Sequence, residues 1–347
     1  MTGISPSLQE LLLRLGVAAL NGSKIYTLFR PFYGGIGHIL MLHRVVPQKN
    51  HNSLNADIEI TQKDLIDILT YFKKNNYKIV SLDEVYNILH EKRTDIKFVS
   101  FTFDDGYKEI DFLVYHLFQK YNYPFTVYLT TGFIDGTAIN WWYALEKIIL
   151  KNERIDFEYN NKEYCFFCSF PNEKYNTFRT IRSLFLNQYN EKNIREVFRK
   201  YHISLQEITA ELTLDWEQVK KMSRNPQVTI GSHTASHHCL KALGAEAVKE
   251  DVLCSLKRLE SQIQKKVEHF SYPFGRKQNG PREFAIIEQL GFKTATTTRF
   301  GNIFPGHWPH RLSLPRIYPI GRLPVLKYLD LLLSGALSAL GYRFKRI

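Results

Sequence analysis

The chain has 347 residues, of which 44% are hydrophobic and 23% are charged, and its formal net charge is +12. These proportions are ordinary for a globular protein and exclude a largely disordered chain, and the length suffices for one full-sized α/β domain. The basic charge suits nucleic acid, an anionic membrane or an acidic saccharide, and equally a protein without a polyanionic partner. Because the sequence carries no zinc-finger spacing or RNP-type aromatic strand, we expect no nucleic-acid partner.

Up to residue 130, short apolar runs alternate with helical patterns, which is typical of β/α units around a largely parallel sheet. Thr61, followed by Asp64 three residues later, marks the start of a helix. An apolar strand leads directly into Asp104, Asp105 and Gly106. We predict helices at 8–20, 61–75, 82–89 and 107–121, and strands at 39–42, 78–80, 97–103 and 125–130.

From about residue 136 to 214 the pattern loosens, and we interpret this stretch as an insertion. It contains Cys165 and Cys168, a C-x-x-C pair that would suit zinc or redox chemistry. No second pair of ligands lies nearby and the flanking residues are apolar, so packing in a strand is the preferred interpretation. With Cys239 and Cys254, these cysteines are too few for a disulfide framework.

The regular pattern returns at Asp215, a residue type suited to cap a helix. We predict further helices at 245–264 and 281–290, and strands at 228–230, 270–272, 293–297 and 314–317.

The two terminal segments are apolar but too short or too polar to span a bilayer. Residues 323–340 are rich in leucine, carry Lys327 and Asp330, and precede a basic tail that ends near Arg346. Such a segment suits a helix lying in a membrane interface, and equally a helix packed on its own domain. Since no secretion signal is recognisable, we expect a cytoplasmic protein, with peripheral binding to the inner membrane face as a hypothesis.

Two groups of polar residues follow predicted strands: Asp104-Asp105, and His233-x-x-x-His237. One carboxylate with two imidazoles is a three-ligand metal set with open positions, and the second carboxylate is then free to act as a base. Either motif alone would more often be a turn or solvated surface, but their position at strand ends favours a site. His238 and Cys239 are competing ligands; His237 is preferred because positions i and i+4 align on a helical turn.

These residues belong to longer motifs that resemble a known family. Residues 101–107 (FTFDDGY), 232–237 (SHTASH) and 272–275 (YPFG) resemble, in order, three motifs of the NodB-like polysaccharide deacetylases, the fourth carbohydrate esterase family. The resemblance covers about residues 38–320 without the insertion. It implies a distorted (β/α) barrel flanked by an N-terminal helical segment (1–37) and a C-terminal amphipathic helix with a basic tail (321–347).

The resemblance also implies the roles of individual residues. Asp105, His233 and His237 would hold Zn²⁺ or another divalent metal, and Asp104 would act as the base. The backbone N–H of Tyr107 would stabilise the oxyanion. Residues of the third motif are expected to bind substrate: Tyr272, Pro273 and Phe274. The aromatic pair after residue 130, Trp141 and Trp142, is expected either to bind substrate or to be buried in the core.

The sequence departs from the family pattern at two catalytic positions. An arginine that steadies the base in many members is replaced by Ser271, and Arg316 is the candidate substitute, with a surface salt bridge as the alternative. The late strand also lacks the acid histidine of many members. The segment around His43 resembles the first strand of a permuted branch that includes poly-N-acetylglucosamine deacetylases. His43 would then protonate the leaving amine, or else cap a buried strand.

The predicted function is removal of an acetyl group from an N-acetylhexosamine unit of a glycan, with a lipid-linked or surface-polysaccharide precursor as the expected substrate. The alternatives are a catalytically inactive carbohydrate-binding barrel, and an amidase or esterase acting on another acetylated compound. The exact sugar, the metal and the oligomeric state are not readable from the sequence.

Overall fold

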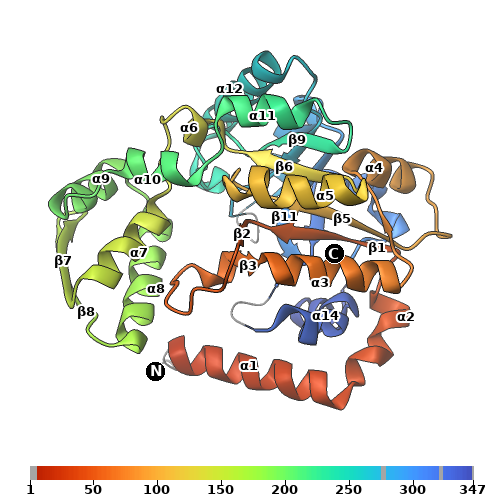
Figure 1. Ribbon diagram of the computed structural model, residues 1–347, viewed down its shortest axis with the longest axis horizontal. Helices are drawn as coiled ribbons and strands as arrows, with labels where there is room; N and C mark the ends of the chain where they lie inside the picture. The colour runs from red at the N-terminus through yellow and green to blue at the C-terminus, as the bar shows by residue number, and fades with distance from the viewer. Residues whose placement is uncertain (1–5, 275–278, 320–322, 346–347) are drawn as a thin grey trace.

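A computed structural model of the chain describes residues 6–274, 279–319 and 323–345, with side chains from residue 15 onward. Its centre is a parallel sheet whose strands lie in the order β1-β5-β6-β9-β10-β11-β12, with β4 paired to β5 (Figure 1). The strands are β1 (Gly37–Leu42), β4 (Lys78–Ile79), β5 (Phe98–Phe103), β6 (Phe125–Leu129), β9 (Val228–Ser232), β10 (His269–Ser271), β11 (Thr294–Phe300) and β12 (Leu314–Arg316).

The last strand returns to the first and nearly closes the sheet into a barrel. Met41 N donates to Ile317 O and Ile317 N donates to Ile39 O, each at 2.8 Å. The closure extends over few residues, which makes the barrel irregular. The predicted distorted (β/α) barrel is therefore confirmed.

Helices surround this barrel, as the alternating pattern predicts. Thr61 and Asp64 form a reciprocal capping box at the start of α3 (Gln62–Lys74), and Asp215 caps α11 (Trp216–Ser223). The barrel-associated helical segments are η2 (Ala56–Ile58), α3 (Gln62–Lys74), α4 (Leu82–His90), η3 (Ile110–Tyr115), α5 (His116–Tyr121), α6 (Thr131–Ile134), α11 (Trp216–Ser223), η4 (Leu240–Ala242), α12 (Ala245–Ile263), α13 (Pro281–Gln289) and η5 (Pro305–His310). A short parallel pair, β2 (Arg44–Val46) and β3 (Glu59–Thr61), extends from β1.

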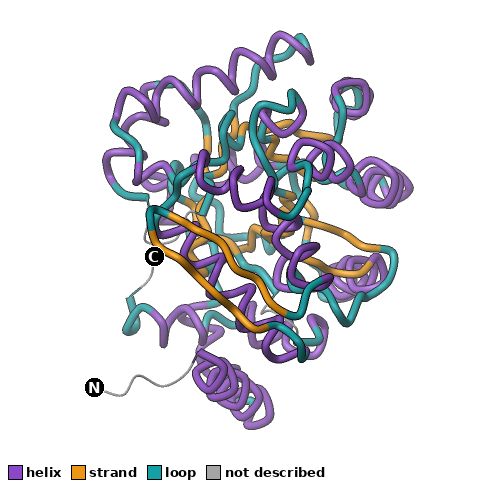
Figure 2. Tube along the Cα trace, turned by 90° about the vertical axis from the view of Figure 1, so that its left-hand side faces the viewer, coloured by secondary structure: helices purple, strands orange, loops and turns teal. Residues whose placement is uncertain are grey.

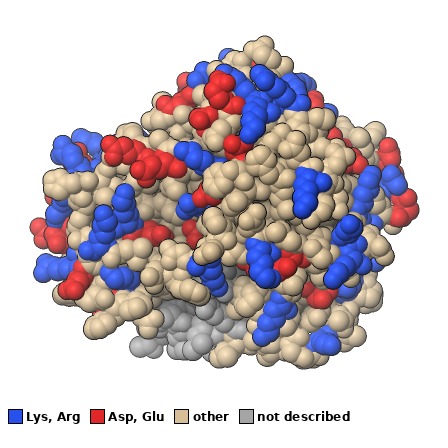
Figure 3. Space-filling view, viewed as in Figure 1, with Lys and Arg blue, Asp and Glu red and all other residues tan. Residues whose placement is uncertain are grey.

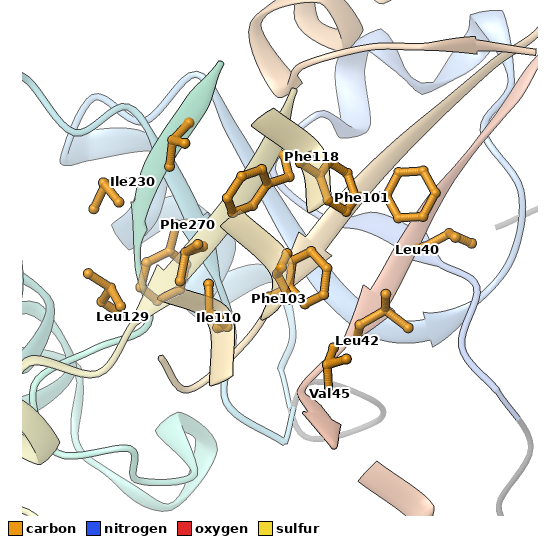
Figure 4. Packing of buried hydrophobic residues seen from close by; sticks show 14 of the residues in the cluster. Leu40, Leu42, Val45, Phe101, Phe103, Ile110, Phe118, Leu129, Ile230 and Phe270 are labelled. Atoms are coloured by element: carbon orange, nitrogen blue, oxygen red, sulfur yellow. The ribbon is translucent and has the colours of Figure 1, made fainter. Parts of the chain in front are cut away.

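The core between sheet and helices is rich in aromatic residues. Figure 4 shows Phe101, Phe103 and Phe118 together, and the ring of Phe118 lies edge-on to that of Phe101 with centroids 5.2 Å apart. The helix predicted at 107–121 begins three residues later, at Ile110, because Tyr107 forms an antiparallel bridge with Thr213.

The predicted insertion forms a separate lobe beside the barrel (Figures 1 and 2). It has its own hydrophobic core, and its strands β7 (Arg154–Tyr159) and β8 (Lys162–Phe167) pair in an antiparallel hairpin. The expected strand around the C-x-x-C pair is β8, in which Cys165 is exposed, whereas Cys168 beyond it is buried. Packing therefore explains Cys168 but not Cys165. The lobe comprises α7 (Trp141–Lys151), β7 (Arg154–Tyr159), β8 (Lys162–Phe167), α8 (Pro171–Asn187), α9 (Glu191–Lys200) and α10 (Leu205–Leu212).

The terminal helices pack together along one edge of the barrel (Figure 1). Four leucines of α14 (Val325–Leu333) are buried, so this helix packs on its own domain, which was one of the two interpretations of the segment, while Leu326 and Leu340 remain exposed. Arg346 lies outside the described residues. None of the described helices combines the length and hydrophobicity needed to cross a bilayer. The segments are α1 (Pro6–Ser23), η1 (Ile25–Phe29), α2 (Arg30–Tyr33), α14 (Val325–Leu333) and α15 (Ala336–Gly341).

Candidate active site

The two aspartates lie where β5 ends, and the backbone there turns sharply. Asp104 N donates to Leu42 O at 2.9 Å, which continues the β1–β5 ladder by one residue. Asp105 and Gly106 then adopt left-handed conformations, with φ of 72° and 77°. Glycine suits position 106 because an L side chain would be strained at this positive φ and its Cβ would lie 2.6 Å from Leu129 Cδ2. This turn directs the two consecutive carboxylates into the same site, at the cost of about 1–3 kcal/mol of strain at Asp105.

His233 follows β9 and is held in one orientation. Its backbone N donates to Leu129 O at 2.9 Å. Its ring Nδ1 lies 2.7 Å from Ser271 O, an acceptor that requires the proton to be on Nδ1. The lone pair of Nε2 therefore faces the site, where it lies 3.4 Å from Asp105 Oδ1.

His237 reaches the same carboxylate, but not from a helix. The segment after β9 is irregular, and Thr234 and His237 both have left-handed φ values, 68° and 57°. The prediction that a helical turn aligns His233 with His237 is therefore wrong, although His237 does converge on the site: its Nε2 lies 3.1 Å from Asp105 Oδ1. The competing His238 points elsewhere, with Nε2 3.7 Å from Glu191.

The three side chains fit a divalent cation. One ligand atom from each of Asp105, His233 and His237 lies within 4.8 Å of the others, and all three residues are buried. Asp105 Oδ1 is buried without a hydrogen bond of proper geometry among the described residues. Burial raises the pKa of Asp105, but the charge that His237 carries when it is protonated and the contact with His233 outweigh it and hold that pKa well below its usual range. Burial lowers the pKa of His237. An ionised carboxylate and neutral imidazole are the forms that bind metal.

Asp104 is held by a fully buried arginine. Arg316 donates through Nη1 and Nη2 to the two carboxylate oxygens, each at 2.7 Å, and through Nε to Thr297 O at 2.9 Å. Ser271, which replaces the family's arginine, accepts from Arg316 Nη2 at 3.0 Å. Burial raises the pKa of Asp104, but the charge of Arg316 outweighs it, so the pKa lies below its usual value. Arg316 is thus no surface salt bridge.

Of the two remaining candidates, His43 lines the cavity, whereas Tyr107 is buried and is not among the lining residues. His43 follows β1 and lines the cavity with both aspartates, and burial lowers its pKa. The bridge between Tyr107 and Thr213 is made by Lys108 N to Leu212 O and Leu214 N to Gly106 O, so it does not use the Tyr107 N–H. The buried Tyr107 hydroxyl accepts from Trp142 Nε1 at 3.0 Å.

The cavity above these groups has a volume of about 430 Å³, which is within the range of small-molecule sites. Trp141 and Trp142 line the cavity although they are nearly buried in the core of the insertion lobe. Both the substrate-binding and the core-burial interpretations of this pair therefore apply. The rings of Trp142 and Phe274 lie 5.2 and 4.9 Å from that of His237.

Tyr272 also lines the cavity, whereas Pro273 is buried without lining it. Gly275 lies outside the described residues.

Sequence reasoning missed several lining residues: Asp57, Arg182 and Tyr318. Arg182 comes from α8 of the insertion lobe, and no motif marks it. On the face drawn in Figure 3, basic residues are interspersed with acidic ones and form no continuous basic stripe.

A nearly closed parallel barrel with a polar site at the carboxyl ends of its strands defines the class of α/β-barrel proteins. The sequence profile of the family described as polysaccharide deacetylase matches residues 91–295. This match covers more than half of the chain, so the chain belongs to the polysaccharide deacetylase family. No curated protein matches the sequence at a significant level.

Solved structures share the fold at low sequence identity. A deacetylase from Streptococcus pyogenes, PplD in complex with acetate, is 18% identical with a TM-score of 0.57, over 85% of this chain and 97% of that chain. IcaB from Ammonifex degensii is 16% identical with a TM-score of 0.56, over 87% and 98% of the two chains. A de-N-acetylase from Aggregatibacter actinomycetemcomitans is 18% identical with a TM-score of 0.51, over 81% and 93%.

Proposed function

We propose that this protein is a metal-dependent deacetylase that removes the acetyl group from an N-acetylhexosamine unit of a glycan, with a lipid-linked or surface-polysaccharide precursor as substrate. One observation carries the proposal: a buried Asp–His–His set shares its cavity with a second carboxylate that is not part of the set. A binding module has no need for a base in that position.

Each polar residue of the site has a distinct role in hydrolysis of the acetamide. A divalent cation such as Zn²⁺, held by Asp105, His233 and His237, would polarise the acetamide carbonyl and lower the pKa of water. Asp104, kept ionised and oriented by Arg316, accepts a proton from the attacking water. The Tyr107 N–H donates to the oxyanion, and His43, in its protonated form, donates a proton to the leaving amine.

The cavity walls support a sugar as the substrate. Aromatic rings from the insertion lobe suit the apolar face of a pyranose, and Arg182 and Asp57 supply polar groups for hydroxyl or anionic substituents. A cavity of about 430 Å³ has room for a small number of sugar rings. The acetylated unit would therefore enter from a chain end or as a small precursor.

The Asp104→Asn variant tests this function. It keeps the size of the side chain and leaves the three metal ligands in place, so acetate release from N-acetylated oligosaccharides should stop while metal content stays at the wild-type level. Unchanged turnover would exclude Asp104 as the base. If the wild-type protein bound these glycans but released no acetate with any divalent metal, it would be a carbohydrate-binding barrel. Release from acetyl esters alone would identify an esterase.

A further inference from the structure

The terminal helices expose a group of large apolar side chains, here named the terminal apolar surface: Ile25, Leu28, Phe32, Leu340 and Phe344. Leu28 and Phe32 are the most exposed of them, at 70% and 62%. Large exposed apolar groups of this kind in a folded protein mark contact surfaces when they are contiguous.

The helical spacing places three of these residues on one side. Ile25, Leu28 and Phe32 recur at positions i, i+3 and i+7 of the continuous segment η1–α2. The intervening Tyr26 points inward and is buried against α14. The segment is therefore amphipathic, with its outer apolar face left uncovered among the described residues.

The C-terminal segment brings its own apolar residues to the same place. The ring of Phe344 stacks on Phe29 with centroids 6.4 Å apart and an interplanar angle of 15°. The hydroxyl of Tyr33 donates to Phe344 O at 3.1 Å. These contacts place the C-terminal segment next to η1–α2, although the two segments lie far apart in the sequence.

This surface is fixed to the barrel rather than frayed. Asn302 Nδ2 donates to Tyr33 O at 2.8 Å and to Leu333 O at 3.0 Å, which ties α2 and α14 together. Gly335 adopts a left-handed φ of 78°, and a Cβ there would lie 2.1 Å from Tyr33 O. The exposed side chains therefore stand on a rigid base.

The charged residues of the two segments that carry this surface are mostly basic. Residues 15–34 and 323–345 hold five basic side chains (Lys24, Arg30, Lys327, Arg343 and Lys345) and one acidic side chain, Asp330. Asp330 accepts from Arg30 at 2.9 Å and from the Tyr71 hydroxyl at 2.6 Å. The remaining positive charge has no acidic counterpart within these two segments.

We propose that the terminal apolar surface docks onto an anionic lipid bilayer, with Leu28 and Phe32 entering the interface and the basic residues contacting headgroups. Apolar insertion combined with basic side chains is the chemistry of interfacial binding. A second copy of the chain is a poorer partner, because a symmetric contact would bring two basic surfaces together. Four leucines of α14 take no part because they are buried (Leu329, Leu331, Leu332 and Leu333), whereas Leu326 is exposed.

Co-sedimentation with vesicles tests the proposal. The full chain should sediment with vesicles of equal parts phosphatidylglycerol and phosphatidylcholine, less with pure phosphatidylcholine, and less at high salt. In the double variant Leu28→Glu plus Phe32→Glu, binding should weaken by at least about tenfold. The matched control is Phe167→Glu plus Phe170→Glu, which changes two equally exposed residues of the insertion lobe (65% and 68%) by the same charge and should bind like the wild type.

A tryptophan variant tests whether position 28 enters the bilayer, and its expected result does not depend on a loss of binding. The fluorescence of Leu28→Trp should be quenched by anionic vesicles containing brominated acyl chains, whereas that of Phe167→Trp should not. The proposal is overturned if the wild type does not bind anionic vesicles, or if both double variants lose binding equally. It is also overturned if, without lipid, the wild type forms a dimer that Leu28→Glu plus Phe32→Glu dissociates, since the partner would then be a second copy.

Discussion

The guanidinium of Arg316 and the carboxylate of Asp104 meet through two parallel hydrogen bonds of 2.7 Å, although 212 residues separate them in the chain. Arg316 is fully buried and Asp104 almost fully. Arg316 also donates through Nη1 to the Thr102 hydroxyl at 3.0 Å. This planar, two-point contact fixes the direction of the carboxylate as well as its charge.

We predict that Arg316→Lys lowers kcat by about 100-fold with a much smaller effect on KM, because an ammonium keeps the charge but cannot hold both carboxylate oxygens. Steady-state acetate release would separate the two parameters. Arg258→Lys is the matched control, since Arg258 forms an exposed pair with Asp135 and should change the free energy of unfolding by less than about 1 kcal/mol. Equal losses of kcat in both variants would contradict a specific role for Arg316.

Two histidine variants, His237→Ala and His238→Ala, distinguish the metal ligand from its neighbour in the sequence. At about 100 times its Kd, Zn²⁺ should stabilise the wild type against unfolding by about 2.7 kcal/mol. His237→Ala should lose this stabilisation, whereas His238→Ala should keep it because His238 faces Glu191 instead of Asp105. Thermal unfolding with and without Zn²⁺ or a chelator measures the effect. If His238→Ala lost the stabilisation by Zn²⁺ and His237→Ala kept it, His238 and not His237 would be the metal ligand.

Much of the barrel was predictable because its signals are local. The capping residues at Thr61 and Asp215 and the apolar strand before Asp104 each depend on a few adjacent residues, and the structure has all three elements in place. The convergence of Asp105 with His233 was predictable for a different reason: parallel strands bring their carboxyl ends to one edge.

Other features depend on packing that no short segment records. The spacing of His233 and His237 fits a helix, yet the chain there is irregular and uses left-handed residues to reach the same point. Arg182 enters the cavity only because the whole insertion lobe packs beside the barrel. The apolar character of the C-terminal segment was visible, but its burial was not, since its covering helix α1 lies at the other end of the chain.

A third prediction concerns the proton donor. His43→Ala should slow hydrolysis of an N-acetylated sugar by about 100-fold or more, because an amine is expelled slowly without protonation. Hydrolysis of para-nitrophenyl acetate should fall by less than about tenfold, because nitrophenolate leaves unprotonated. Comparing the two substrates on one preparation distinguishes a proton donor from a structural residue. Equal losses on both substrates would indicate that His43 only shapes the site.

The fourth prediction concerns stability and pH at His38, a buried residue of β1 whose Nδ1 lies 2.8 Å from Asn302 Oδ1. Burial lowers its pKa from 6.5 to about 4. The unfolded chain therefore binds this proton first, and His38 destabilises the fold progressively as the pH falls from about 6.5 to about 4. Relative to neutral pH, the loss at about pH 5 should be about 2 kcal/mol.

His38→Asn keeps a donor near the Nδ1 position and should remove that part of the pH dependence. Urea unfolding in chelator, at neutral pH and near pH 5, measures it, because the other buried histidines then contribute equally to both proteins. His51→Asn, at an exposed position, should leave the wild-type slope unchanged. The prediction is contradicted if the free energy of unfolding falls with pH equally in the wild type and in His38→Asn. His38 would then take up its proton in the folded protein as readily as in the unfolded chain, and the contact with Asn302 would have to accommodate a charged ring.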